Sequence, residues 1–187
     1  MLKYLITGFE PFAGIDVNPS SELITYLKSQ ENHRFDFHIF PVVYEQVNQE
    51  LKKLSIENYD FILMYGLASR SNAVLLERVA INWIESQIPD NSGCLINSEP
   101  IELESPPAFI NRMRLEAYIS KLSHAEWEGE ALEFKISHSA GAYLCNYLYY
   151  KVFQRNPRCL FVHLPLGHDL QRLENLSRLN QILLGKS

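Results

Sequence analysis

The chain has 187 residues and a formal net charge of −5, from 17 lysines and arginines against 22 aspartates and glutamates. Its composition, 47% hydrophobic and 21% charged, excludes a disordered or collagen-like chain. The mild acidity argues against a nucleic-acid-binding protein, and no apolar run approaches the ~20 residues of a membrane span. The N-terminal apolar stretch is too short for a signal peptide, and three cysteines without C-x-x-C spacing predict neither a disulfide framework nor a zinc site. These features indicate a cytoplasmic protein.

Short apolar runs alternate with helical periodicity along the chain, without an internal repeat or a linker. This alternation predicts an α/β fold with a largely parallel sheet, in a single domain of residues 1–187. The stretch 66–108 is expected to add an antiparallel or irregular element. The predicted strands are 4–7, 35–40, 61–65, 79–81, 132–136 and 160–162. The predicted helices are 18–28, 44–54, 108–122, 143–153 and 170–184.

Ligands of open α/β sheets bind beyond the carboxyl ends of the strands. The loops to inspect therefore follow residues 7, 40, 65, 136 and 162. Two aromatic residues, a glycine-bearing turn and a histidine fall in these loops: Phe9, Phe12, residues 137–141 and His163. We expect these groups to converge on one edge of the sheet.

Cys145 is the first candidate nucleophile, because it follows a Ser-Ala-Gly turn near the start of a predicted helix. Free N–H groups at a helix N-terminus stabilise a thiolate, which is the nucleophile that acyl transfer needs. Most lone cysteines are instead buried structural residues. Cys159, at the start of an apolar strand, fits that description better, and Cys94 lies in a polar turn with no evident role. Spacing alone leaves both interpretations of Cys145 open.

Three histidines compete for the role of general base. His163 ends a predicted buried strand and is well placed for proton transfer, although taken alone such a residue is more often a hydrogen-bonded core histidine. His138 lies in the turn before Cys145, and His168 lies in a loop expected to be solvated.

Glu77 is the unusual carboxylate, because it lies between two apolar segments. A charge in such a place must be paired or functional. Arg78 is the simple structural partner, although neighbouring residues of a strand point to opposite faces. Nucleotide binding has no support, since Gly8 does not belong to a G-x-G-x-x-G motif and residues 66–72 do not fit a P-loop.

Four segments resemble the pyroglutamyl peptidase I family, in the family's order and across nearly the whole chain. They are residues 8–14 (GFEPFAG) with 17–20 (VNPS), 77–82 (ERVAIN) with 88–93 (IPDNSG), 137–146 (SHSAGAYLCN) and 161–165 (FVHLP). The resemblance implies a cytoplasmic cysteine peptidase that removes an N-terminal pyroglutamyl residue from small peptides with a blocked N-terminus. It implies Cys145 as nucleophile, His163 as base and then acid, and Glu77 as the group that orients His163.

The same resemblance implies a three-layer α/β/α sandwich of the phosphorylase/hydrolase-like kind, commonly a homotetramer, with no metal or organic cofactor. It places the substrate pocket at Phe9, Phe12, Asn18, Val42, Leu67, Ile88, Tyr143 and Leu144. Pyroglutamate is a small, flat, uncharged lactam, which suits apolar walls and a few aimed hydrogen bonds. Asn18 is expected to supply one of these bonds, by its side chain or its backbone.

The chain departs from the family pattern at two positions. Leu67 stands where the family usually has Gln, and Gln87 stands where it usually has Arg. Loss of the arginine cation at position 87 weakens electrostatic support for the oxyanion or the site geometry, an effect of about 3 kcal/mol.

Two alternative functions follow from these departures. One is a divergent thiol hydrolase with another small lactam or acyl substrate, and the other is a binding protein that keeps the fold without turnover. A nucleoside phosphorylase, suggested by fold analogy alone, would need a phosphate site that no motif supports.

Overall fold

A six-stranded sheet forms the centre of the molecule, in the order β2-β1-β3-β8-β4-β7. Its strands are β1 (Tyr4–Phe9), β2 (Phe35–Phe40), β3 (Phe61–Leu67), β4 (Val74–Glu77), β7 (Phe134–Ser137) and β8 (Cys159–Leu164). The four strands β2, β1, β3 and β8 are parallel, whereas β4 runs antiparallel to β8 and parallel to β7. β5 (Val79–Ile81) and β6 (Ala108–Ile110) form a separate antiparallel pair. This computed structural model describes residues 2–30, 35–129, 132–167 and 170–185.

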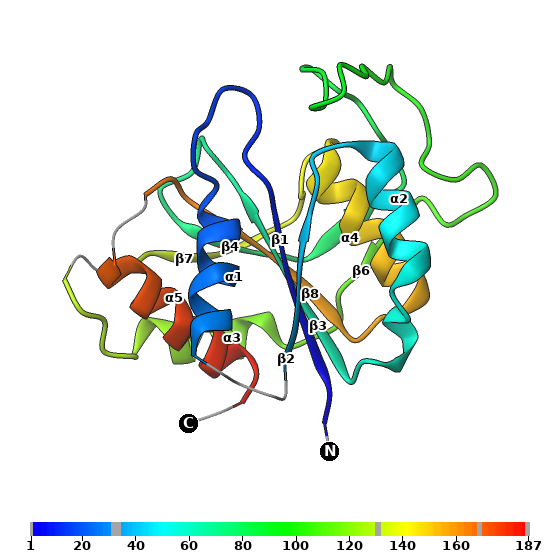
Figure 1. Ribbon diagram of the computed structural model, residues 1–187. Coiled ribbons are helices and arrows are strands. Elements are labelled where there is room, and N and C mark those ends of the chain that lie inside the picture. The colour runs from blue at the N-terminus through cyan, green and yellow to red at the C-terminus, as the bar shows by residue number, and fades with distance from the viewer. Residues whose placement is uncertain (1, 31–34, 130–131, 168–169, 186–187) are drawn as a thin grey trace.

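Helices cover both faces of the sheet, as Figure 1 shows. One layer holds α1 (Pro19–Ser29), α3 (Leu115–Ser123) and α5 (Leu170–Leu183), and the other holds α2 (Tyr44–Lys53) and α4 (Leu144–Arg155); a short 3₁₀ turn spans Ile56–Asn58. Each layer buries its own apolar cluster against the sheet. The expected three-layer α/β/α architecture with a mostly parallel sheet is therefore confirmed. Within the described ranges, no helix is long and apolar enough to cross a membrane.

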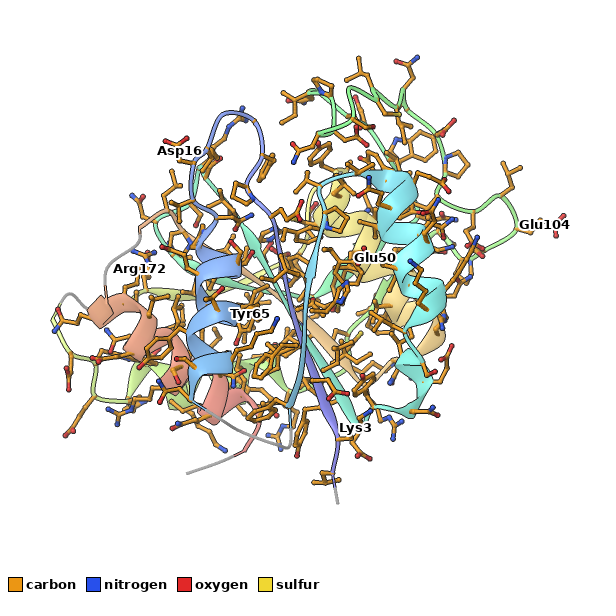
Figure 2. The ribbon with its side chains drawn as sticks, viewed as in Figure 1. Lys3, Asp16, Glu50, Tyr65, Glu104 and Arg172 are labelled. Carbon is orange, nitrogen blue, oxygen red and sulfur yellow. The ribbon has the colours of Figure 1, made fainter. Side chains whose placement is uncertain are left out.

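Local signals explain the elements that frame the site. The Asn18 side chain caps α1 by accepting a hydrogen bond from Ser20 N at 3.0 Å, and Pro19 occupies the first turn, where its missing N–H costs nothing. The central strands β3 and β8 are buried on both faces, as continuous apolar runs predict. Tyr65 on β3 points into the layer of α1 and α5, where its hydroxyl donates to Asn180 Oδ1 at 3.4 Å (Figure 2).

Three sequence predictions need correction. Residues 108–122 are not one helix, because Ala108–Ile110 pairs with β5 as a strand and α3 begins only at Leu115. β4 was not predicted as a strand, since its four residues are too short to show a period. β7 runs in the opposite direction to the central strands. The loop after residue 136, which was expected to begin at the carboxyl edge of the sheet, therefore begins elsewhere. The expected antiparallel element between 66 and 108 is confirmed in β4 and β5.

Candidate active site

Glu77 and His163 form a buried pair on two neighbouring strands. Leu75 lies opposite His163 across the β4–β8 ladder, and Glu77 lies two residues further along the same face. Glu77 Oε1 is 2.7 Å from His163 Nδ1. Glu77 is fully buried and His163 is 7% exposed. Arg78 instead makes an ion pair with Glu116 at 2.6 Å, so it is not the partner of Glu77.

Cys145 occupies the first turn of α4, where it lies next to His163. Gly66 pairs with His163 across the β3–β8 ladder, and both residues therefore present the same face. A Cβ added at Gly66 would be 2.8 Å from Cys145 Sγ. The thiol thus lies directly above the strand position beside the imidazole. The absence of a side chain at Gly66 is what makes room for it.

The electrostatics of His163 reflect both neighbours. Burial favours the neutral ring, but charge and hydrogen bonding from Cys145, together with Glu77, outweigh it and raise the pKa of His163 to about 9. Because Nδ1 faces Glu77, Nε2 is the nitrogen left for the thiol. At neutral pH this arrangement favours the imidazolium form of His163 beside the Cys145 side chain.

A small, narrow apolar pocket lies beside the thiol. Its lining residues are Phe9, Phe12, Asn18, Val42, Leu67, Tyr143, Leu144 and Cys145. Seven of the eight pocket residues expected from the sequence are therefore brought together with Cys145. Ile88 is not among them, and it is 39% exposed.

Asn18 lies in the pocket wall with its side chain already engaged. Its Oδ1 accepts from Ser20 N at 3.0 Å and Ser20 Oγ at 2.8 Å, and its Nδ2 donates to Glu10 O at 3.0 Å. These bonds fix the turn between β1 and α1, which carries Phe12 above the pocket. The side chain therefore shapes the pocket wall, and its oxygen has no free capacity for a ligand.

Residues 86–94 pack against two segments that line the pocket, and sequence reasoning identified there only a turn. Tyr143 Oη donates to Pro89 O at 3.1 Å, and Asn91 Nδ2 donates to Pro11 O at 3.0 Å. The buried Asp90 carboxylate accepts from three backbone N–H groups, those of Tyr44, Ser92 and Cys94. Burial opposes the charge, but these bonds and the Ser92 hydroxyl lower the pKa of Asp90. The turn residues alone did not indicate this docking.

The remaining candidates are not part of this cluster. Cys159 is fully buried, and burial raises the pKa of its thiol, which fits the structural role expected for it. Cys94 and His138 are exposed. His168 lies outside the described residues. Within the part of the chain that the structure describes, no group of three or more His, Cys, Asp or Glu residues is arranged to hold a metal ion.

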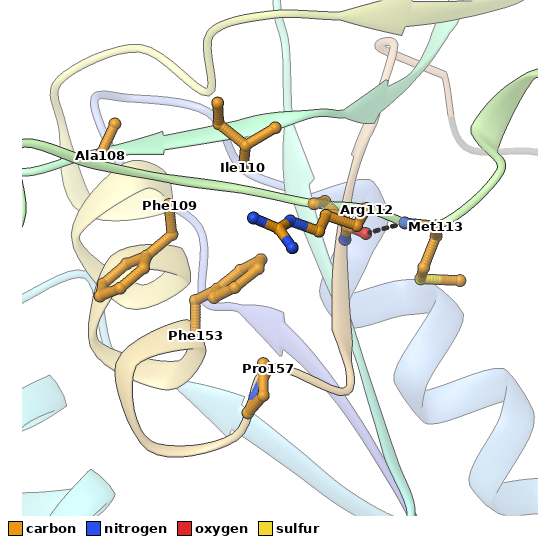
Figure 3. A pocket seen from close by; sticks show the side chains of 8 residues that line it. Ala108, Phe109, Ile110, Arg112, Met113, Phe153 and Pro157 are labelled. Atoms are coloured by element: carbon orange, nitrogen blue, oxygen red, sulfur yellow. Dashed lines mark hydrogen bonds between the residues drawn. The ribbon is translucent and has the colours of Figure 1, made fainter.

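A larger hollow, of about 520 Å³, lies at the other end of α4 (Figure 3). The stacked rings of Phe109 and Phe153, 5.3 Å apart, form part of its lining together with Arg112. Phe153 lies eight residues beyond Cys145, or about 12 Å along the helix. This hollow is therefore separate from the thiol.

Comparisons with known proteins agree with this geometry. The family model described as pyroglutamyl peptidase matches residues 2–168. The pyrrolidone-carboxylate peptidase of Vibrio vulnificus (strain YJ016) is 35% identical over 173 residues, which are 89% of this chain and 79% of that protein. The Pyrococcus furiosus enzyme of the same name is 35% identical over 153 residues, covering 80% and 71% of the two chains. The crystal structure of pyrrolidone carboxyl peptidase from Thermus thermophilus superposes with a TM-score of 0.86, at 30% identity, over 98% of this chain and 100% of that one. The chain belongs to the pyroglutamyl peptidase family.

Proposed function

We propose that this protein is a cysteine peptidase that removes the N-terminal pyroglutamyl residue from peptides, and that residues 1–187 act as one domain. Cys145 is the nucleophile, His163 is the general base and then the general acid, and Glu77 orients His163. The observation that carries this proposal is the alignment of a buried carboxylate, an imidazole and a thiol beside a small apolar pocket. Family membership supports the reaction.

The chemistry follows from the atoms in the cluster. The thiolate of Cys145 attacks the pyroglutamyl carbonyl carbon, and the amide C–N bond breaks as His163 Nε2 gives its proton to the departing amine. A water molecule then attacks the thioester while His163 accepts its proton, which releases pyroglutamate and restores the thiol. The first N–H groups of α4 have no intrahelical partners, so they are suited to stabilise the negative oxygen of each tetrahedral intermediate. Glu77 keeps Nδ1 protonated and holds the ring in place throughout.

The pocket supports a small uncharged acyl group. Its wall is dominated by aromatic and aliphatic side chains, and it contains no carboxylate to pair with a free amine. The nitrogen of a lactam belongs to an uncharged amide, so transfer of the lactam from water into such a pocket costs little desolvation free energy. Small peptides with a blocked N-terminus are thus the proposed substrates. Cytoplasmic location and a homo-oligomer, both implied by the family resemblance, belong to the same proposal.

The test is hydrolysis of a pyroglutamyl-aminomethylcoumarin amide. Cys145→Ala is expected to lower kcat/KM by roughly 10³-fold or more, because it removes the nucleophile. Cys94→Ala is the matched control, since Cys94 is exposed and outside the cluster, and it should change kcat/KM by less than about twofold. Equal hydrolysis by the wild type and by Cys145→Ala would refute the proposal.

A second candidate is a thiol hydrolase with a different small acyl substrate. Leu67 favours it, because Leu67 lines the pocket at a position where the family usually has Gln. A panel of pyroglutamyl, acetyl, formyl and prolyl amides separates the two candidates by their kcat/KM values. Faster release from an amide other than pyroglutamyl would favour the second candidate. A Cys145 thiol that does not react with iodoacetamide at neutral pH would instead favour the non-catalytic binding protein.

A further inference from the structure

Asn146, the residue after Cys145, is fully buried in the first turn of α4. Its amide makes three hydrogen bonds to the backbone of the segment that follows Glu77. Oδ1 accepts from Ile81 N at 2.9 Å, while Nδ2 donates to Ile81 O at 2.9 Å and to Trp83 O at 3.0 Å. The amide therefore closes the edge of β5 that faces away from β6, in the way that a neighbouring strand would.

This contact joins the segment that carries the thiol to the segment that carries the carboxylate. β5 begins at Val79, two residues after Glu77. One turn further along α4, the Tyr149 hydroxyl donates to the Glu77 backbone carbonyl at 3.0 Å. Buried polar groups whose hydrogen bonds are satisfied specify one arrangement of the elements that they connect. Asn146 and Tyr149 therefore set the position of α4 relative to the end of β4.

The start of α4 lacks the side-chain cap that usually fixes a helix end. The N-cap residue, Tyr143, makes no side-chain cap hydrogen bond. Gly141, two residues earlier, has a φ of 81°, so the chain enters the helix through a left-handed residue. A backbone bond from Glu85 N to Ala142 O, at 2.9 Å, is the neighbouring attachment to the same segment. The Asn146 amide thus supplies side-chain anchoring where the cap supplies none.

We propose that Asn146 is a positioning residue for the reaction: it holds the Cys145-bearing turn of α4 against β5, and so keeps the thiol beside the Glu77–His163 pair. This inference rests on the proposed role of Cys145 as the nucleophile. Without the amide, the first turn of α4 can shift along β5 while the helix stays packed through Leu148. The thiol would then move away from the imidazole that stabilises its ionised form.

The test measures the thiol directly, without a substrate. Asn146→Ala and the milder Asn146→Ser are compared with the wild type in the rate of Cys145 alkylation by iodoacetamide, located by mass spectrometry. If the Cys145 thiol is displaced by about 1 Å, we expect its alkylation at pH 7 to be slower by about tenfold to a hundredfold. A similar loss is expected in kcat on the pyroglutamyl amide. KM is also expected to rise, because Tyr143 and Leu144 of the same turn line the pocket. The alkylation deficit should shrink at alkaline pH, where thiols ionise unaided.

Asn156→Ala is the matched control at the opposite end of the same helix. Asn156 is 2% exposed, and its amide also bonds three backbone groups: those of Ile56, Tyr59 and Arg158. A comparable loss of stability is expected for both alanine variants, but Asn156→Ala should leave alkylation and kcat within about twofold of the wild type.

Three results would overturn the inference. The first is unchanged alkylation in folded Asn146 variants, and the second is the same change in Asn156→Ala. The third is failure of both Asn146 variants to fold while Asn156→Ala folds, since that would assign Asn146 a purely structural role. A wild type that alkylates rapidly but hydrolyses no pyroglutamyl amide would refute the proposed function alone, and the alkylation comparison would still decide the role of Asn146.

Discussion

Two histidine–carboxylate contacts within the described residues use the same chemistry in different surroundings. His38 Nε2 on β2 lies 2.5 Å from Glu50 Oε2 on α2, and the two side chains are 25% and 30% exposed. His163 and Glu77 are 2.7 Å apart, with side chains 9% and 0% exposed. The contact distances are similar, so they do not distinguish the pairs. What distinguishes the second pair is exclusion from water, a thiol on the far side of the ring and an adjacent pocket.

The largest expected effect comes from removing the charge of one carboxylate at a time. Glu77→Gln keeps the shape of the side chain but no longer stabilises the imidazolium, so kcat/KM on the pyroglutamyl amide should fall by about 10²- to 10⁴-fold. Glu50→Gln makes the same change at the exposed pair and should alter kcat/KM by less than about twofold. Equal effects at the two sites would show that Glu77 has no special role.

The second effect acts on the thiol side of the buried pair. Gly66→Ala places a Cβ 2.8 Å from both Cys145 Sγ and the Phe161 ring, so the thiol must move. We expect kcat to fall by about a hundredfold from this displacement, with destabilisation of about 1–3 kcal/mol from overpacking. Stopped-flow kinetics and urea unfolding measure the two quantities separately. Full activity in a folded Gly66→Ala protein would contradict the placement of the thiol above Gly66.

The pH profile gives a third test, because the pKa of the buried His163 is raised to about 9. The imidazolium of His163 is present below its pKa of about 9 and is lost above it. The kcat/KM value should therefore fall about tenfold per pH unit above pH 9. His38→Gln should leave this alkaline limb in place. A limb near the ordinary histidine value of about 6.5 would mean that Cys145 and Glu77 do not hold the charge on His163.

The contrast between the two pairs also explains which features the sequence could predict. The helix that begins near Asn18 and the strands β3 and β8 depend on local residue patterns, and all three elements were predicted. The contact between Glu77 and His163 joins residues 86 apart, so composition and spacing could not identify it. Only the resemblance between motifs placed these two residues and Cys145 in one site.

The wrong predictions also come from contacts between residues that are far apart in the sequence. The reversal of β4 and β7 is decided by pairing across the sheet, which no local pattern records. Residues 108–110 were assigned to a helix because the β5 strand that pairs with them lies far away in the sequence. The docking of Asp90 onto the start of α2 was missed for the same reason, since its acceptor role appears only once the loop is folded back.

Asp90 offers a fourth and smaller test, because its carboxylate accepts hydrogen bonds from backbone N–H groups instead of contacting a histidine. Asp90→Asn should weaken the loop 86–94, which contacts Pro11 and the pocket residue Tyr143, so KM should rise several-fold while kcat changes little. The lost charge-assisted bonds should destabilise the protein by about 1–3 kcal/mol at pH 7. Because the folded pKa is lowered, this contribution is present above the unfolded value near 3.8 and disappears as the pH falls through the folded value. A wild type and variant with equal stability at pH 7 would contradict this role.

Leu67 gives the smallest expected effect and tests the pocket rather than the pairs. Leu67 is 7% exposed at the end of β3, and it lines the pocket immediately after Gly66. Leu67→Gln introduces a polar amide into the pocket wall. If the lactam of the substrate forms a hydrogen bond with this amide, binding becomes tighter; without such a bond, the amide is buried without a partner, which is unfavourable. We expect KM for the pyroglutamyl amide to fall by about two- to tenfold, with kcat unchanged, because ground-state and transition-state binding improve equally. Leu67→Met is the control, since it keeps an apolar side chain of similar volume. A rise in KM that occurs only in Leu67→Gln would mean that the pocket has been tuned for a more apolar acyl group, which is the behaviour of the second candidate function.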